Sequence, residues 1–312
     1  MPNLPTDPKA THRAWLQIHL CVFLWGFTAI LGKMISLPAL PLVWWRMVFV
    51  VGALALIPRV WRGLRAMPLQ LIGKYAGIGV LVALHWLTFY GAIKLSNASV
   101  GATCIALGTV FVALLEPVLA HARFSKRDVL LGVLVLPGVA LVVGGVPSGY
   151  RLGILVGAIS ALLVAIFGSL NKRYVHHGDP LTVTAIELGA GTVALTLLAP
   201  LMPHLPGMAQ AFPGAVFVVP GARDAVLLVV LALACTLLPF ALSLAALRHM
   251  SAFAQQLAVN LEPVYAIVLA ALLFGEQREL TPAFYLGVAI LLGAVFLHPL
   301  LARPRPPSIV AP

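Results

Sequence analysis

The chain has 312 residues, of which 61% are hydrophobic and only 9% are charged, and its mean hydropathy is +1.04. Soluble domains carry about 25% charged residues, so this composition excludes that class and indicates a membrane protein. The formal net charge of +11 would suggest nucleic acid on a soluble protein. Here the basic residues lie in short gaps between apolar runs, so we expect no nucleic-acid partner.

Ten apolar stretches are long enough to cross a membrane. A bilayer core about 30 Å thick requires roughly 20 apolar residues per helix. In chain order the stretches are 14–33, 40–57, 72–93, 98–120, 128–146, 152–170, 180–200, 224–246, 251–274 and 281–301. The first is long for a signal peptide and no clear A-x-A site follows it, so we expect an uncleaved helix.

The gaps between these stretches differ in charge. Fourteen Lys and Arg residues fall on one side, and five fall on the other: Lys33, Lys94, Arg151, Arg223 and Arg278. The positive-inside rule therefore predicts that both termini, residues 1–13 and 302–312, are cytoplasmic. We expect a multi-pass protein of the inner (cytoplasmic) membrane.

The two halves of the sequence repeat weakly. LLGVLVLPGVAL at 130–141 matches FYLGVAILLGAVF at 284–296, and GAIK near residue 94 matches AALR near residue 248. Each half, 14–146 and 152–301, holds five predicted helices. Because five is odd, the second half enters the membrane from the opposite side. The sequence thus predicts an all-α membrane fold of two inverted five-helix repeats, an architecture that many secondary transporters use.

Four charged residues fall within predicted helices. Each costs about 2.5–3.5 kcal/mol at a helix centre, so a partner or a watery cavity is expected. Arg46 and Glu187 occupy similar places in their repeats. They favour an ion pair or a binding site for a zwitterionic or charged substrate; the alternative is a structural bridge, or an Arg that reaches an interface. Glu116 lies near the cytoplasmic end of 98–120, where an interfacial role is favoured.

Glu262 lies deeper in its helix and is followed by Pro263. Proline removes a backbone donor, and such broken helices are tolerated in transporters where they line a cavity. Gln255, Gln256, Asn260 and Tyr265 surround the break. We expect Glu262 to point into a polar cavity and to be a candidate proton-coupling site. The alternative is a kink whose carboxylate bonds only neighbouring backbone.

Aromatic and imidazole side chains occupy the middle of two further helices. His85, Trp86 and Tyr90 lie in ALHWLTFYGA, and Trp25 precedes Gly26 in the first helix. A substrate-lining role and a packing role are equally favoured for these residues. Gly26 is better explained by close helix packing.

No enzyme motif accompanies these residues. GxSxG, HExxH, a Walker A loop and paired aspartates are all missing from the sequence. Cys21, Cys104 and Cys235 lie in apolar runs without CxxC spacing, so they predict neither disulfides nor a zinc site. We expect no enzyme activity, no metal and no cofactor.

The order of these features resembles the EamA family of the drug/metabolite transporter superfamily. The resemblance covers about residues 14–301 and rests on Trp25-Gly26, Arg46, and Glu262-Pro263 followed by Phe274-Gly275-Glu276. It implies a basket-like arrangement around a central cavity, and secondary transport, often export, of small metabolites. It also implies that Trp25, Arg46 and Glu262 face the cavity and that Glu276 lies at the outer end of the ninth helix.

The sequence therefore predicts a secondary transporter, exporting small polar or amphipathic metabolites such as amino acids by alternating access. Its expected partners are that substrate, the lipid bilayer and protons coupled through Glu262. Two alternatives remain at this point: a flippase for a lipid-linked substrate, and a membrane sensor or enzyme that transports nothing.

Overall fold

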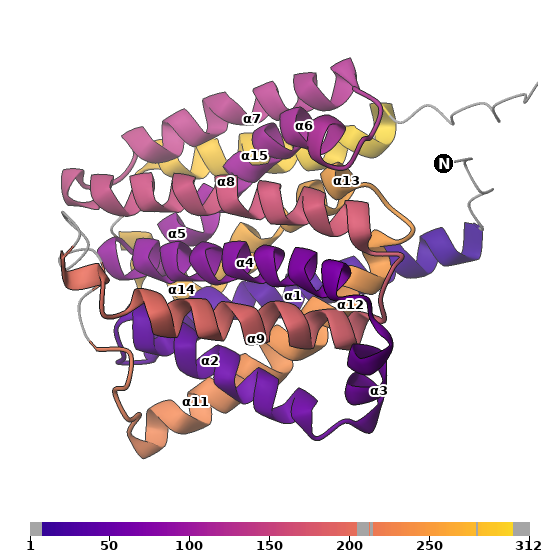
Figure 1. Cartoon of the computed structure of the whole chain (residues 1–312). Coiled ribbons are helices and arrows are strands. Elements are labelled where there is room, and N and C mark those ends of the chain that lie inside the picture. The colour runs from indigo at the N-terminus through magenta and orange to yellow at the C-terminus, as the bar shows by residue number, and fades with distance from the viewer. Residues whose placement is uncertain (1–7, 205–211, 213–214, 279, 302–312) are drawn as a thin grey trace, which may run out of the picture.

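The computed structural model describes residues 8–204, 212, 215–278 and 280–301, and this part of the chain is helical with no β-strand (Figure 1). The predicted all-α class is confirmed. The first half contains α1 (Pro8–Met34), α2 (Ala39–Ala55), α3 (Pro58–Ala66), α4 (Leu69–Leu95), α5 (Ala98–Cys104), η1 (Ile105–Leu107), α6 (Gly108–Leu119) and α7 (Lys126–Gly144). The second half contains η2 (Ser148–Tyr150), α8 (Arg151–Tyr174), α9 (Pro180–Leu198), η3 (Met202–His204), α11 (Ala222–Ala232), η4 (Leu233–Leu237), α12 (Leu238–Leu247), α13 (Ala252–Val259), α14 (Glu262–Phe274), η5 (Glu276–Arg278) and α15 (Pro282–Leu301).

Each of the ten predicted stretches contains helical segments, but fewer than ten of the described helices have the length and composition of a membrane span. Among the described residues seven do so, or eight if α2 and α3 count as one bent span. The C-terminal segment contributes a shorter apolar helix, Pro282–Gly293. The predicted tails lie outside the described residues, except for 8–13, which continue α1.

Two predicted helices differ from the expected stretches at positions that the sequence explains. The predicted stretch 40–57 ends two residues early, because Ile57 precedes a proline and adopts an extended backbone. Pro58 then starts α3, which turns 90° away from α2. The stretch 224–246 contains the π-helical turn η4 just before Pro239, a residue that removes a helical hydrogen bond.

Side-chain caps set the starts of several helices. The side chains of Asn97, Ser125, Asp179 and Ser251 each accept a hydrogen bond from the backbone N–H three residues later. Such caps satisfy amide groups that the first helical turn leaves unpaired. They place the turns of the bundle at positions that the local sequence specifies.

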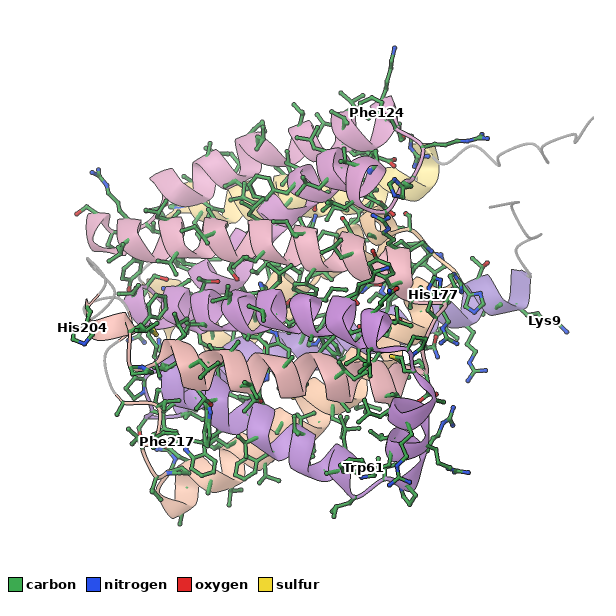
Figure 2. All side chains as sticks on the ribbon, viewed as in Figure 1. Lys9, Trp61, Phe124, His177, His204 and Phe217 are labelled. Carbon is green, nitrogen blue, oxygen red and sulfur yellow. The ribbon has the colours of Figure 1, made fainter. Side chains whose placement is uncertain are left out.

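The two ends of the bundle differ in character. One, called here the basic end, carries Lys9, Trp61, Phe124 and His177, whereas the far end carries His204 and Phe217 (Figure 2). Helix α3 lies at the basic end and contributes Arg59, Arg62 and Arg65. All three of these arginine side chains are exposed.

Close helix contacts hold the two halves together. Helix α4 packs on α8 and α9 from the other half, and α7 packs along α15. At the second contact a Cβ on Gly138 would lie 2.8 Å from the carbonyl oxygen of Gly287. Glycine is therefore required for this approach, in the manner of small-residue contacts between membrane helices.

Candidate functional site

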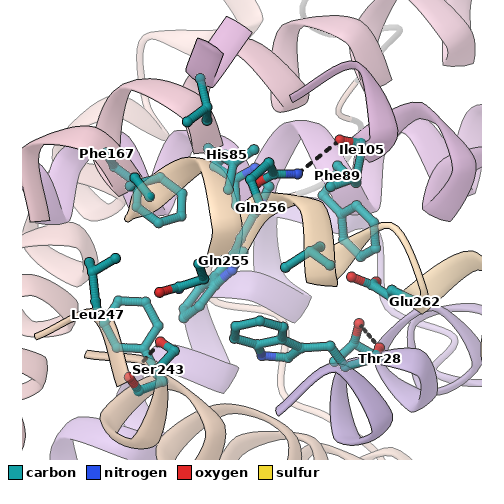
Figure 3. A pocket seen from close by; sticks show the side chains of 18 of the residues that line it. Thr28, His85, Phe89, Ile105, Phe167, Ser243, Leu247, Gln255, Gln256 and Glu262 are labelled. Carbon is teal, nitrogen blue, oxygen red and sulfur yellow. Dashed lines mark hydrogen bonds between the residues drawn. The ribbon is translucent and has the colours of Figure 1, made fainter. Parts of the chain in front are cut away.

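A cavity of about 100 Å³ lies between the two halves of the chain (Figure 3). Its wall is drawn from α1, α2, α4, η1, α6, α8, α12, α13 and α14. Aromatic side chains dominate it: Trp25, Trp86, Phe89, Phe167 and Phe240. Sites for drug-sized ligands hold roughly 300–1,000 Å³, so in this conformation the cavity fits only a small ligand unless the walls move.

Arg46 supplies the cation of the cavity. Its side chain is 2% exposed, and its Nε and Nη1 groups donate to Thr236 Oγ1 and to the Tyr90 hydroxyl, the latter at 3.0 Å. The guanidinium carbon lies 3.9 Å from the ring centroid of Trp86, and such a desolvated cation–π contact is worth about 2 kcal/mol. These contacts use two of the five guanidinium donors, so the group is oriented but retains donors for a ligand.

Glu262 supplies the carboxylate of the same cavity. Helix α13 ends at Val259 and α14 begins at Glu262, so the helix break falls where Pro263 predicted it. Glu262 is 6% exposed, and no hydrogen bond or ion pair in the described part of the chain holds its carboxylate. The wall also contains Gln255, whose buried Oε1 has no hydrogen-bond partner among the described residues. The cavity thus offers two acceptors that a ligand could satisfy.

The break between α13 and α14 faces a second break, between α5 and α6. Gln256 Nε2 donates to the carbonyl of Ile105 at 3.2 Å, and Asn260 Nδ2 donates to Thr109 Oγ1 at 2.9 Å. Gly108 permits this approach, because a Cβ there would lie 2.8 Å from Gln256 Nε2. The two interrupted helices are therefore connected at the level of the cavity by one side-chain-to-backbone bond and one bond between side chains.

His85 lines the cavity and is fixed by the opposite half of the chain. Its Nδ1 lies 2.9 Å from the carbonyl oxygen of Ser160, and its ring contacts those of Phe89 and Phe167. Nδ1 also lies 2.8 Å from Ser160 Oγ, and this hydroxyl donates to the backbone carbonyl of His85 at 2.9 Å, so Ser160 contacts both the ring and the backbone of His85. Packing and lining, which the sequence left as alternatives, are combined in this residue.

Not all sequence-predicted site residues share the wall. Trp25, Arg46, His85, Trp86, Gln256 and Glu262 line the cavity, whereas Tyr90, Glu187, Asn260 and Tyr265 do not. Tyr90 lies behind Arg46 as its hydrogen-bond partner. Asn260 bonds Thr109 instead of facing the space.

Glu187 and Tyr265 lie away from the cavity for different reasons. Glu187 is fully buried on α9, where Asn171 Nδ2 donates to it at 3.3 Å. No ion pair joins it to Arg46 in the described part of the chain, so the paired arrangement considered from the sequence is not formed. Tyr265 is 37% exposed and packs against Phe23 and Gly26. Because Gly26 has no Cβ, α1 and α14 can approach closely at this point.

A carboxylate clamp closes the far end of the bundle. Glu276 is 1% exposed and accepts hydrogen bonds from Lys33 Nζ at 2.7 Å, from Ser99 Oγ at 2.6 Å and from the amides of Ala98 and Ser99. It therefore joins the end of α14 to α1 and to the start of α5. Burial raises the pKa of Glu276, but the bonds from Lys33 and Ser99 outweigh it and leave that pKa below its usual value. We call this group the far-end clamp.

The basic end has a matching clamp between the same two interrupted helices. Glu116, near the end of α6, is 5% exposed and accepts from the amides of Ala252 and Phe253 at 2.8 Å each. The interfacial role expected for Glu116 is thus replaced by a buried one, the capping of α13. This group is the basic-end clamp, and it pairs the end of α6 with the start of α13 as the far-end clamp pairs the end of α14 with the start of α5.

The cavity extends toward one end only. Leu247 and Ala252, in its wall, flank the α12–α13 turn, and Arg248 of that turn donates to the carbonyls of Val175 and Gly178 at the basic end. None of the described residues of the far-end clamp belongs to the wall. The cavity therefore occupies the half of the bundle between Arg46 and the basic end.

Several wall residues had no sequence signal. Phe167 and Ser243 look like ordinary residues of apolar helices, and Ile105 lies in a break that no proline marks. Gln255 does have a signal, because it is an amide beside the Glu262 break. An uncharged polar side chain near a predicted helix break is a usable indicator of a cavity wall.

Comparisons with known proteins identify the family and the fold of this chain. The profile of the EamA-like transporter family matches residues 13–144 and again 151–306. Among curated proteins no sequence matches this chain. One solved crystal structure superposes with a TM-score of 0.67 at 18% identity, over 95% of this chain and 98% of the other. At that identity the likeness concerns the fold alone.

Proposed function

The chain belongs to the EamA-like transporter family, a family of multi-pass membrane transporters, and from this premise we propose that it is a secondary transporter of a small amphipathic zwitterion. The observation that carries the proposal is that Arg46 and Glu262 both line one aromatic-walled cavity between the repeats. Amino acids and related metabolites have this chemistry, with opposite charges close together and an apolar side chain.

The charges of the cavity support such a substrate. Charged groups inside a membrane are expensive and normally serve a ligand, an ion path or each other. Arg46 is oriented by Thr236, Tyr90 and Trp86 but not neutralised by Glu262, so a substrate carboxylate can bind its remaining donors. A substrate ammonium would find Glu262 and the unpaired Oε1 of Gln255.

The two clamps support alternating access by two inverted repeats. Lys94 Nζ donates to the carbonyl of Ile35, just past α1, and Lys172 Nζ donates to the carbonyl of Leu247, at the end of α12. These contacts lie at opposite ends, as do the clamps of Glu276 and Glu116. An inverted repeat produces equivalent contacts at opposite ends, and transport follows when one end opens as the other closes.

The proposed membrane arrangement has ten spans; α2, α7 and α15 each form one, and α3 lies outside the spans at the basic end. The two repeats are 14–146 and 152–301. The basic end faces the cytoplasmic side of the inner membrane and both termini are cytoplasmic, because the positive-inside rule places the side richer in Lys and Arg in the cytoplasm. In this arrangement the far-end clamp closes the outer side, and the described conformation is inward-facing. Export is the proposed direction, with protons coupled through Glu262.

Proteoliposome flux tests this proposal. Proteoliposomes that contain the parent, Arg46→Ala or Arg151→Ala are loaded with an amino acid. Counterflow is then measured with a panel of radiolabelled aromatic and aliphatic amino acids. The parent and Arg151→Ala, which removes an exposed arginine outside the cavity wall, should exchange at least one zwitterion, whereas Arg46→Ala should not. Equal flux in all three would exclude this cavity, and no flux in the parent would favour a flippase or a sensor.

A further inference from the structure

A second hollow lies on the side of the bundle, remote from the cavity. It holds about 350 Å³ and is walled by α2, α3, α4 and the first half of α9. Val60, Trp61 and Leu64 of α3 form one wall, and Ile72, Ile186 and Gly189 lie among the others. We call it the α3 groove. Its lining is almost entirely apolar, and it shares no lining residue with the cavity.

Helix α3 has two faces of opposite chemistry. Val60 and Leu64, one turn apart, line the groove, whereas Arg59, Arg62 and Arg65 are exposed and do not belong to its lining. Arg59 pairs with Asp179, which leaves Arg62 and Arg65, three residues apart, as exposed cations. A short amphipathic helix with this pattern lies in the plane of a membrane interface.

Local contacts hold α3 in that position. The indole nitrogen of Trp61 donates to the carbonyl of Ala55 at 2.8 Å, near the end of α2. Gly63 packs directly against the side chain of Thr182 at the start of α9. The arginines therefore lie beside the mouth of the groove, at the basic end, where Trp61 is also placed (Figure 2).

We propose that the α3 groove binds one acyl chain of an anionic phospholipid, whose head group lies against Arg62 and Arg65. An apolar hollow on the flank of a membrane helix bundle is filled by hydrocarbon, because water there would leave apolar surface exposed. The paired arginines add a charge preference, since guanidinium groups bind phosphate oxygens in a bidentate manner. A zwitterionic lipid gains the same burial but less from the arginines.

Two sets of variants separate the groove from the head-group site. Gly189→Leu adds a side chain inside the groove at a position where a Cβ meets no atom within 4 Å. Gly77→Leu on α4 is its matched control, since Gly77 is equally open but does not line the groove. Arg62→Gln/Arg65→Gln removes the proposed head-group contacts. Arg123→Gln/Lys126→Gln makes the same charge change in the exposed turn beside Phe124, on another edge of the basic end (Figure 2).

The test is the thermal unfolding midpoint of delipidated full-length protein in a neutral detergent. Dioleoyl phosphatidylglycerol, dioleoyl phosphatidylcholine or inorganic phosphate is added to separate samples. We expect phosphatidylglycerol to raise the parent midpoint by about 3–6 °C more than phosphatidylcholine, and phosphate to leave it unchanged. The excess should disappear in Arg62→Gln/Arg65→Gln and persist in Arg123→Gln/Lys126→Gln.

Gly189→Leu should lose the response to phosphatidylglycerol that Gly77→Leu keeps. Equal shifts from the two lipids in the parent would overturn the proposal, as would a phosphatidylglycerol preference that survives the loss of both arginines. A full response to phosphate would show a free-anion site instead. If Gly189→Leu does not fold, the two arginine variants and their control still decide the outcome.

Discussion

The far-end clamp should control which side of the cavity opens. Glu276→Gln keeps the size of the side chain but removes the charge that Lys33, Ser99 and the start of α5 share. The amide nitrogen of glutamine is a donor. It would therefore face N–H or O–H donors that, in the parent, donate to one of the two carboxylate oxygens of Glu276. The substitution should therefore weaken closure of the far end without removing a cavity residue.

The size of the effect follows from the contacts. Breaking one side of a buried ion pair costs about 3–5 kcal/mol, and hydrogen bonds to charged groups contribute about 1.5–3 kcal/mol each. The Lys33 side chain is 34% exposed and can hydrate when released, and glutamine retains part of the hydrogen bonding. We therefore expect closure to weaken by about 2–3 kcal/mol, which raises the open population roughly 30- to 150-fold.

Thiol labelling from the outside measures that population. The reporter is Thr28→Cys in the cavity wall, in a chain whose buried Cys21, Cys104 and Cys235 are replaced by Ala. A membrane-impermeant thiol reagent added outside should label the Glu276→Gln version 30- to 150-fold faster than the parent, by the population arithmetic above. The control is Glu116→Gln, which weakens the basic-end clamp on the same helices and should not raise the rate.

The same assay has a defined pH dependence. Glu276 has a lowered pKa, so the free energy it contributes to closure is present above the usual carboxyl pKa and is lost as pH falls through the lower folded value. The parent rate, divided by that of Glu276→Gln, should stay flat from about pH 8 to 5 and rise only below about pH 4.3. Unchanged labelling in folded Glu276→Gln, or faster labelling in Glu116→Gln, would refute the assignment of this clamp as the outer gate.

Three further outcomes are expected. Glu262→Gln keeps the shape of the cavity but removes a titratable group, so substrate exchange should persist while dependence on a pH gradient is lost; flux driven by pH as in the parent would leave Glu262 a kink residue. Gly79→Ala should lower the unfolding free energy by about 1–3 kcal/mol, because its Cβ overlaps the backbone of Glu187, whereas Gly77→Ala on the same helix meets open space and should not destabilise. A reporter fused after Ala302 should lie in the cytoplasm and one inserted near Gln210 outside, both sites being beyond the described residues; the reverse in both would contradict the orientation.

The amino-acid sequence determined the parts of this protein that depend on local chemistry. Apolar runs of about 20 residues specify helices because the bilayer leaves no other way to satisfy backbone groups. Pro263 marked the break in the ninth predicted helix, and the structure has that break between α13 and α14. The position of Arg46 and Glu262 in the cavity wall could also be predicted from the sequence, because a charge in an apolar helix requires polar surroundings.

Tertiary structure decided what depends on helix rotation and on partners far along the chain. Glu116, Glu187 and Glu262 look alike in sequence, yet one caps α13, one bonds Asn171 and one faces the cavity. Tyr265 turned outward because α1 approaches closely at Gly26. Glu276 gained its role from Lys33, 243 residues away in the chain, and from the start of α5. The sequence determines which residues each helix contains. The direction that each side chain faces is set by the helices that pack against it.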